Sequence, residues 1–568
     1  MKNMMRKSTL GVLLTVTLAC EPPAEQVEAT LELPDTVTFS AHIAPILYEN
    51  CVACHRVDGH APFSLTSYGD AKLQGPAITE ATAARRMPPW LPERGEHQFD
   101  GERFLTDWQI GAIRKWVESG APPGDSTAIP ELPAMAHGWQ LGEPDMVLEM
   151  PNAFTLYAMG PDRFRNFVIP VDIDRPRYVR AVDLDPGEGH VIHHAMIMVD
   201  DTHSSKRRDR QDPEPGFDGM FAGSAARPPS GSFLGWTPGK VPDKGTAGLA
   251  WKLEPGMDVV LQLHLQPRGQ EQEVRAAVGL YFTDEPPTRL SYWLTLGSRK
   301  IDLPAGKRGI EVFDSYVLPV DARIFGMYPH AHYLGDEIES TATLPSGESI
   351  SLMSIHRWNF NQQDFYRYVE PVSLPRGTEV TMRISFDNSD ENPFNPNDPP
   401  RRVTYGPASG DEMANLFVQI VVGDSADLRT LEQDFGRKYQ RDLEEGMRFL
   451  LDVFPDNVSY MAELGQMLQA RGQFTEGKRW YQRALAIDPT YQLARYNLGT
   501  AVEAEGDLAG AKHLYTLVTK AEPDNVPALF NLAALVQAEG DVNEAILTYL
   551  DVIELEPTHA GAHNILGN

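Results

Sequence analysis

The sequence has 568 residues, of which 50 are Lys or Arg and 79 are Asp or Glu, so its formal net charge is −29. A chain of this length exceeds what one hydrophobic core usually serves, and we expect several domains. The acidic balance argues against nucleic acid as a partner, because phosphates require a basic surface. The only cysteines are Cys20, Cys51 and Cys54, and the roles assigned below leave none for a disulfide framework.

The first 20 residues have the composition of an export signal. Basic residues precede an apolar run over 10–19, which is too short to span a bilayer as a helix. The end of this run resembles the bacterial lipoprotein cleavage site, which implies a lipid on Cys20 and a location on the periplasmic or cell-surface side of a membrane. Ordinary signal cleavage nearby is the alternative. We expect a signal peptide over 1–19 and a disordered tether over 20–36, which is rich in Pro and Glu.

A haem attachment motif follows an amphipathic stretch over 39–50. In Cys51-Val52-Ala53-Cys54-His55, the two thiols would bond the haem vinyl groups and His55 would be an axial iron ligand. A redox-active pair of cysteines is the alternative, but it would not need the histidine. The motif predicts one c-type haem.

The second axial ligand is expected to be Met87, in a segment that resembles the methionine segment of cytochromes c, with His97 as the alternative. A closing amphipathic helix is predicted over 105–117. We therefore expect a small all-α, cytochrome c-like domain over 37–126, followed by a linker over 127–142 that is rich in Pro, Gly and hydroxyl residues.

The central part of the chain has the pattern of antiparallel β structure. From about residue 146 to 422, short alternating segments such as 177–184 and 257–264 are interrupted by Pro and Gly. This pattern of short alternating segments predicts β-sandwiches.

Four short motifs in this region carry metal-binding side chains. His330 and His332 are separated by one residue, so in a strand both imidazoles point to the same face. Imidazole suits copper, zinc, iron or nickel, whereas a thioether favours Cu(I). In the other three motifs, the residues that we single out as candidate ligands are His193, His194, His264 and Met413.

These motifs resemble the ascorbate-dependent type II copper monooxygenases, which include peptidylglycine hydroxylating monooxygenase and dopamine β-monooxygenase, from about Glu143 to about Asp424. The resemblance implies two jelly-roll-like β-sandwich domains, 143–288 and 289–424, each holding one copper ion across an open cleft. It implies that the electron-transfer copper is held by His193, His194 and His264, and that the catalytic, oxygen-binding copper is held by His330, His332 and Met413.

Departures from this family bear on the substrate. Ala414 replaces the cysteine of the animal members. Tyr328 and Phe417 replace an Arg and a Tyr that bind the substrate carboxylate in the peptide-processing enzyme, although Asn415 matches the family. The loss of a bidentate carboxylate ligand weakens the case for a C-terminal glycine substrate. Tyr328, Asn415 and Phe417 therefore form an expected substrate pocket for an aromatic or otherwise apolar molecule.

The C-terminal part has a helical repeat. Gly472, Gly506 and Gly540 are each 34 residues apart, and a proline repeats with the same step at 455, 489, 523 and 557. This is the tetratricopeptide period. We expect a connecting helix within 425–454 and an α-solenoid over 455–568. Such arrays bind protein partners on a concave surface, and a stability or dimerisation cap is the alternative.

Together these features predict a copper-dependent monooxygenase that uses two copper ions, one c-type haem and O₂ to hydroxylate a C–H bond of a small organic or peptide-like substrate. The haem held by His55 and Met87 is expected to pass electrons to the first copper, with an ascorbate-like reductant or a redox protein as the external donor. A non-catalytic copper-binding or copper-sensing lipoprotein and a pure electron-transfer module are the alternatives. A zinc hydrolase is disfavoured because Met413 would be a poor zinc ligand.

Overall fold

The computed structural model describes residues 32–568 except 58, 60, 134–137, 188–190, 220–225, 230–234, 239, 241, 247, 557–558 and 568. The expected export signal with Cys20, and Pro557, therefore lie outside the described residues. The chain divides into two compact units. In the described ranges, no helix combines the length and the apolar character that crossing a bilayer requires.

The first unit is helical. It comprises the described part of Met1–His55, together with Phe63–Pro88 and Phe104–Pro133. Phe39, Leu47 and Trp116 are fully buried in its core. Its elements are η1 (Phe39–Ile43), α1 (Ala44–Asn50), α2 (Tyr68–Leu73), α3 (Gly75–Ala83), α4 (Asp107–Glu118) and η2 (Ser126–Ala128). Helix α4 begins at a capping box in which Thr106 and Gln109 satisfy each other's backbone N–H groups, close to the start predicted from the sequence.

The stretch Pro89–Arg103 groups with the second unit, although the sequence placed it inside a domain over 37–126. The rings of Trp90 and Phe99 pack against Tyr366, and Phe99 also stacks on Tyr368 with ring centroids 4.7 Å apart. Burial of these aromatic side chains outweighs continuity along the chain.

Two antiparallel sheets with one hydrophobic core between them form the first part of the second unit. One sheet has the order β1-β11-β4-β8 and the other β6-β3-β9-β5-β7. Leu280 of β11 and Leu261 of β9, both fully buried, belong to the shared core. The elements are β1 (Met146–Glu149), β2 (Phe154–Leu156), β3 (Arg163–Pro170), β4 (Arg177–Asp185), β5 (Ile192–Asp200), α5 (Ser204–Gln211), β6 (Phe217–Asp218), β7 (Gly235–Trp236), β8 (Trp251–Leu253), β9 (Asp258–Leu265), β10 (Gln272–Val274) and β11 (Ala277–Thr283).

A second pair of antiparallel sheets follows, with the orders β12-β21-β15-β18 and β14-β19-β16-β17. Leu416 of β21 and Ile384 of β19 are fully buried between them. The elements are β12 (Leu290–Gly297), β13 (Asp302–Leu303), β14 (Lys307–Val317), β15 (Ala322–Ala331), β16 (Gly335–Thr343), β17 (Ser349–Ile355), η4 (Phe360–Gln362), β18 (Tyr366–Leu374), β19 (Glu379–Asn388), β20 (Val403–Thr404) and β21 (Ala414–Val422). We refer to the two pairs of sheets as the first and second sandwiches.

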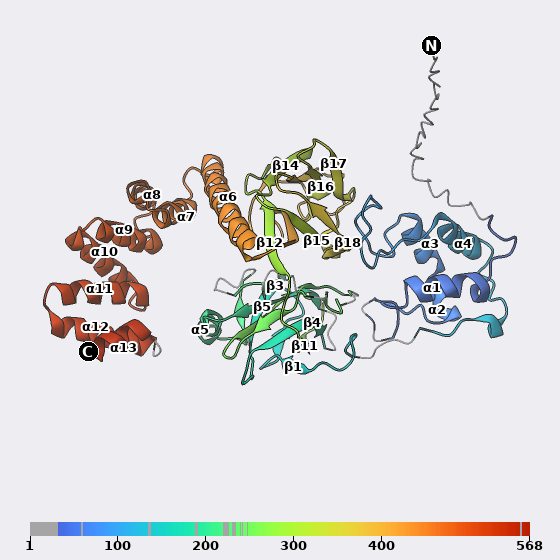
Figure 1. Cartoon of the computed structure of the whole chain (residues 1–568), viewed down its shortest axis with the longest axis horizontal. Helices are drawn as coiled ribbons and strands as arrows, with labels where there is room; N and C mark the ends of the chain where they lie inside the picture. Colours follow the sequence, from blue (N-terminus) through green and yellow to red (C-terminus); the bar gives the residue numbers. More distant parts are fainter. Residues whose placement is uncertain are drawn as a thin grey trace, which may run out of the picture. The chain divides into compact units, whose positions relative to one another are not determined.

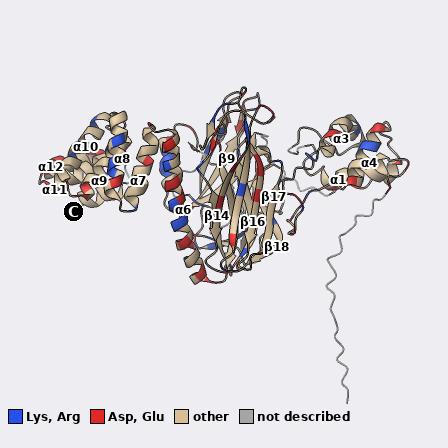
Figure 2. Ribbon diagram, turned by 90° about the horizontal axis from the view of Figure 1, so that it is seen from above, with Lys and Arg blue, Asp and Glu red and all other residues tan. Residues whose placement is uncertain are grey.

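Helix α6 (Ser425–Val453) lies beside β12 of the second sandwich (Figure 1). It begins where the Asp424 carboxylate accepts the backbone N–H groups of Ala426 and Asp427. Leu431 and Phe435 extend the core of the sandwich, whereas charged residues of both signs follow the rest of the helix (Figure 2). The connecting helix expected within 425–454 is therefore a structural part of the second sandwich.

The C-terminal helices stack in sequence order as a solenoid (Figure 1), which confirms the helical repeat predicted from the 34-residue period. Gly472, Gly506 and Gly540 each adopt a positive φ between paired helices, where glycine is favoured. The helices are α7 (Val458–Ala470), α8 (Phe474–Ile487), α9 (Gln492–Ala504), α10 (Leu508–Ala521), α11 (Val526–Ala538), α12 (Val542–Leu555) and α13 (Ala560–Leu566).

Candidate metal centres

Strands β5 and β9 of the first sandwich bring three histidines together. Consecutive residues of a regular strand point to opposite faces, so His193 and His194 could not both face one site without a distortion. The register supplies it: Ile192 pairs with Leu265 and His194 with His264, which leaves His193 as the extra residue of a β-bulge. The bulge turns two adjacent imidazoles toward the third.

The three Nδ1 atoms form a nearly equilateral triangle. Nδ1 of His193 lies 3.1 Å from Nδ1 of His194 and 3.2 Å from Nδ1 of His264, and the third side measures 3.4 Å. A point equidistant from the three atoms is about 1.9 Å from each, close to the roughly 2.0 Å of a metal–imidazole bond. The arrangement fits a single metal ion.

Burial keeps the imidazoles of His193 and His194 neutral. It lowers the pKa of His193 to about 4 and holds the pKa of His194 well below its ordinary value, and repulsion among the rings acts in the same direction. Neutral imidazole is the form that donates a lone pair to a metal. These two rings can therefore bind a cation at neutral pH.

Asp162 fixes the orientation of His264. Nε2–H of His264 donates to Oδ2 of Asp162 at 2.8 Å, which leaves Nδ1 free to face the triangle. Burial alone would raise the pKa of Asp162, but the hydrogen bond and the charge of His264 outweigh it and lower that pKa. The ring of Phe164 stacks on His264 with centroids 4.1 Å apart, which limits rotation of the imidazole.

The second pair of histidines lies at the end of β15 in the second sandwich. Nδ1–H of His330 donates to Oε1 of Gln363 at 2.6 Å, and Nδ1–H of His332 donates to the carbonyl oxygen of Asp411 at 3.0 Å. Because these oxygens can only accept, Nε2 of each ring keeps its lone pair. Nε2 of His332 is buried and has no hydrogen-bond partner among the described residues. Burial lowers the pKa of His330 to about 3 and that of His332 to about 4. An orphaned buried nitrogen of this kind fits a metal ligand.

Met413 directly precedes the first residue of β21. In the β15–β21 ladder, Ala331 pairs with Ala414, so His332 and Met413 are the next residues outward on the two strands. Met413 is 3 % exposed. Its position beside the pair of histidines suits a soft third ligand.

Glu412 ties the two segments together. Its buried carboxyl group accepts the backbone N–H groups of His332 at 2.9 Å, Leu334 at 2.6 Å and Met413 at 3.1 Å. Burial raises the pKa of Glu412 to about 8, although the backbone donors act in the opposite direction. One side chain thus fixes the spacing between the histidines and the methionine.

Phe360 separates the two ligand sets. It belongs to η4 of the second sandwich, and its ring stacks on His193 with centroids 5.7 Å apart and meets His332 edge-on at 5.6 Å. Phe360 is 4 % exposed. One buried aromatic ring therefore contacts a histidine of each set.

The expected substrate residues share one face of β15 and β21 with His330. Tyr328 pairs with Phe417, and His330 pairs with Asn415. Residues directly opposite in an antiparallel ladder point to the same face, as do residues two apart on one strand. Gly297 of β12 makes room for Asn415, because a Cβ atom there would lie 2.3 Å from Oδ1 of Asn415.

The haem motif follows α1 in the first unit. Nδ1–H of His55 donates to the carbonyl oxygen of Phe63 at 3.1 Å, which leaves Nε2 for an iron ion. Burial and the neighbouring Cys54 raise the pKa of Cys51 to about 12. Both thiols are unbridged, as attachment to a haem requires. Cys51, Cys54 and His55 therefore fit a covalently attached haem.

The two expected sixth ligands lie in different units. Met87 follows α3 in the first unit and is 39 % exposed, whereas His97 belongs to the second unit, where its ring packs against Tyr368. Because Met87 lies in the same unit as His55, Met87 is favoured over His97 as the second iron ligand.

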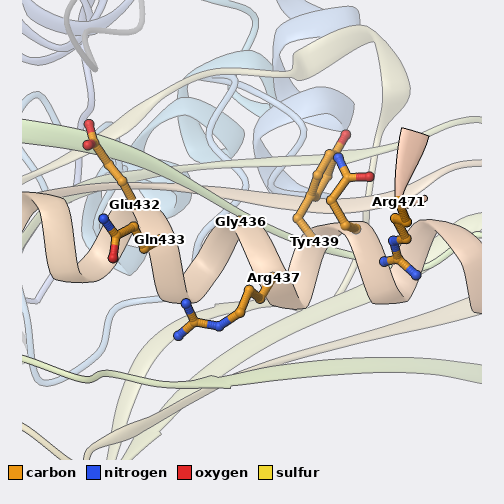
Figure 3. A pocket seen from close by; sticks show the side chains of 7 residues that line it. Glu432, Gln433, Gly436, Arg437, Tyr439 and Arg471 are labelled. Carbon is orange, nitrogen blue, oxygen red and sulfur yellow. The ribbon is translucent and has the colours of Figure 1, made fainter. Parts of the chain in front are cut away.

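Two other groups of side chains do not form comparable sites. Glu337, Glu339 and His356 gather together, but Arg383 pairs with both carboxylates. A recess of ≈ 640 Å³ on α6 includes Glu432, Arg437 and Tyr439, and Figure 3 shows these side chains pointing in different directions. The carboxylates of the first group are therefore already neutralised by Arg383, and the side chains of the second do not converge.

Four residues that complete the candidate centres were not singled out by sequence reasoning: Asp162, Phe360, Gln363 and Glu412. Glu412 adjoins Met413 in its motif, so its position carried a signal. The other three lie in segments without a motif, and nothing in the sequence links them to the histidines.

No protein-family model matches the chain, and no curated protein matches it. Among solved structures, the first tetratricopeptide domain of Spaghetti (RPAP3) bound to the HSP90 peptide SRMEEVD is 24% identical, covering 19% of this chain and 87% of that chain with a TM-score of 0.19. The crystal structure of MamA is 19% identical, covering 26% of this chain and 82% of that chain with a TM-score of 0.22. At these scores, neither likeness adds to what the helices of the solenoid themselves show.

Proposed function

We propose that the chain is a copper-dependent monooxygenase that hydroxylates a C–H bond of an organic molecule. The observation that carries the proposal is the convergence of three imidazole nitrogens from His193, His194 and His264 on one point. Such a donor set suits copper or zinc. The second set contributes a thioether from Met413, and this soft ligand favours copper.

Copper ions held by the two sets would supply one-electron steps, so that one atom of O₂ enters a C–H bond and the other leaves as water, with two electrons and two protons from a donor. The residues around the sets prepare the site. Gln363 and the backbone carbonyl of Asp411 hold His330 and His332 with Nε2 available. Phe360 is buried and contacts His193 and His332, so it would limit the access of water to the ligands of both sets.

The substrate would bind over the face of β21 and β15 that carries Tyr328, Asn415 and Phe417. The Tyr328 hydroxyl donates to Oε1 of Gln363 at 3.2 Å, so the ring is fixed relative to His330. The apolar faces of Tyr328 and Phe417 would accept an aromatic or aliphatic group, and Asn415 offers an amide for one polar contact.

A c-type haem on Cys51 and Cys54, with His55 and Met87 or His97 as iron ligands, would deliver electrons one at a time. The hydrogen bond from His55 to the Phe63 carbonyl supports this assignment because it fixes the tautomer that an iron ligand needs. An external donor, either an ascorbate-like reductant or a redox protein, would then reduce the haem.

Two further parts of the proposal concern location and partners. Export and lipidation at Cys20 would place the chain on the periplasmic or cell-surface side of a bacterial membrane. The solenoid, α7 to α13, would bind a protein partner. Mass spectrometry of the mature N-terminus, with Cys20→Ser as control, tests the first part. Cross-linking of the full chain in membranes tests the second.

The experiment for the central proposal loads the full chain with haem and copper, reduces it without oxygen and mixes it rapidly with O₂. We expect fast reoxidation of the haem that slows at least tenfold in His330→Ala and in Met413→Ala. His513→Ala changes an exposed histidine on α10 and serves as the control. Copper is counted in every variant, so that loss of the metal is distinguished from loss of reactivity.

Two results would contradict the proposal. Uptake of two copper ions without any O₂ consumption would favour the non-catalytic copper-binding protein. Haem reoxidation that is unchanged in both ligand variants would show that haem and copper are not coupled.

A further inference from the structure

A cavity of ≈ 840 Å³ lies within the second unit and is lined by both sandwiches and by part of Pro89–Arg103. This volume lies within the range of small-molecule sites, roughly 300–1,000 Å³. Aromatic side chains from several elements line it: Trp90, Trp236, Trp251, Phe325, Phe365 and Tyr368. The cavity is therefore suited to a ligand with an apolar body.

More positively than negatively charged side chains line the cavity. Six of its lining residues are Lys or Arg and four are Asp, in a chain whose formal net charge is −29. Three of the carboxylates are already paired, Asp364 with Lys240 and both Asp100 and Asp243 with Arg367. The lining of the cavity therefore has an excess of positive charge, although the chain as a whole is acidic.

Three of the cations that line the cavity have no carboxylate partner among the described residues: Arg180, Lys244 and Arg289. Arg180 donates instead to the carbonyl oxygen of Lys244 at 2.9 Å. The guanidinium of Arg289 lies over the ring of Phe325, 5.6 Å from its centroid, and Lys244 lies on the loop between β7 and β8. The fourth carboxylate, Asp183, accepts backbone N–H groups from Gln140 and Leu184 instead. Lys244 and Arg289 are thus available to an anion.

The cavity and the second ligand set lie on the same face of one sheet. Gln419 lines the cavity, and Phe417 and Asn415 follow it on β21 at steps of two residues, with His330 opposite Asn415. Four residues of a strand span about 13 Å.

Aromatic rings cover the face between the cavity and His330. Trp293 lies 5.7 Å from Phe417 and 6.0 Å from Phe365, and Tyr328 lies 5.8 Å from Phe417, all between ring centroids. An apolar chain that extends from the cavity would follow these rings toward His330.

We propose that this cavity binds the anionic end of an elongated small molecule, with Lys244 and Arg289 as the anion-binding residues and the apolar body directed along Phe417 and Tyr328 toward His330. This inference rests on the proposed function, because only in the proposed monooxygenase is a molecule that points toward His330 the substrate. It names an anionic apolar or aromatic compound as the substrate class and excludes aromatic amines, whose ammonium group would face the unpaired cations.

The test uses metal-free full-length chain and three ligands that differ only in their terminal group: 6-phenylhexanoate, 6-phenylhexan-1-ol and 6-phenylhexylamine. Binding is followed by calorimetry and by the fluorescence of the cavity tryptophans. We expect the carboxylate to bind at least tenfold more tightly than the alcohol, and the amine to bind most weakly. High salt should weaken only the carboxylate.

Charge reversal then locates the anion. In Lys244→Glu/Arg289→Glu, we expect the carboxylate to lose at least tenfold in affinity, the alcohol to keep its affinity and the amine to gain. Lys307→Glu, on an exposed part of β14, is the matched control. Circular dichroism and the retained affinity for the alcohol show that the variant is folded.

Three outcomes overturn the inference: equal affinities for carboxylate and amine, an unchanged carboxylate affinity in the charge-reversed variant, or no binding of the carboxylate below about 10 mM. Failure of the proposed function is separate from these, because binding is measured without metal. A chain that binds the carboxylate as expected but consumes no O₂ with copper would have the anion site and would not be the proposed enzyme.

Discussion

The two sandwiches hold their metal-type ligands in different ways. In the first, His193, His194 and His264 come from two neighbouring strands, and a bulge in the ladder is enough to make them converge. In the second, the ligands stand at the end of β15 and in the loop before β21. A ladder fixes geometry by its own hydrogen bonds, whereas a strand end and a loop need an additional tie, which Glu412 provides.

The groups behind the ligands differ in charge. Asp162, a carboxylate, accepts from His264, while neutral acceptors, the Gln363 amide and the Asp411 carbonyl, hold His330 and His332. A carboxylate raises the basicity of its imidazole and stabilises a more highly charged ion. In the proposed enzyme, this difference and the thioether of Met413 would favour Cu(II) at the first set and Cu(I) at the second, the order that the proposed electron flow from the first to the second requires.

The largest effect is expected from removing the tie in the second sandwich. Glu412→Ala leaves three buried backbone N–H groups without their acceptor, and we expect a loss of about 3 kcal/mol in the free energy of unfolding. Copper bound per chain should fall from two to one, because the first set does not depend on this residue. Chemical denaturation and metal analysis measure the two quantities.

Glu412→Gln keeps a carbonyl acceptor and should recover most of the stability. Glu348→Ala, in an exposed turn between β16 and β17, is the control for loss of a glutamate. If Glu412→Ala still bound two copper ions with wild-type affinity, the loop would be positioned by its packing, and the contrast between the sandwiches would fail.

A smaller effect is expected from Asp162→Asn in the first sandwich. The asparagine keeps the size of the side chain but removes the charge behind His264, and we expect copper affinity at the first set to fall by about 10–100-fold. The reduction potential of that copper should rise, because the negative charge that stabilises Cu(II) through His264 is removed. Competition with a chelator and a spectroelectrochemical titration measure these changes.

Asp172→Asn, at an exposed position after β3, is the matched control. A copper affinity and potential that stayed at wild-type values in Asp162→Asn would mean that packing against Phe164 alone orients His264.

Local patterns predicted the regular elements of this molecule well. The 34-residue period predicted the solenoid because each tetratricopeptide repeat is a local unit, and the alternating segments 177–184 and 257–264 correspond to β4 and β9. The connecting helix was expected within 425–454, and α6 spans Ser425–Val453, where the Asp424 cap satisfies its first N–H groups.

The surroundings of the ligands could not be predicted in the same way. Asp162 and His264 are 102 residues apart in the sequence, and His330 and Gln363 are 33 apart. Their meeting depends on how strands pair and how the two sandwiches pack, which no local pattern encodes. The same applies to Phe360: a single Phe before a partly exposed strand has no signal that distinguishes a residue in contact with both ligand sets from an ordinary core residue.

The smallest predicted effect compares an ion pair from each sandwich as the pH is lowered. In the first, Arg165 donates to Asp212 and lowers the pKa of that carboxyl group. Since the unfolded chain binds the proton first, Asp212 contributes stability that is lost as the pH falls below its ordinary pKa of 3.8. In the second, burial raises the pKa of Asp314 despite its hydrogen bond to Lys438, so the folded chain binds the proton first and Asp314 lowers stability as the pH rises above 3.8.

Asp212→Asn should therefore flatten the loss of stability below pH 3.8, and Asp314→Asn should remove the decline in stability above that pH. Urea unfolding between about pH 3 and 6 distinguishes the two slopes, and equal slopes in both variants would show that the two carboxylates have the same environment.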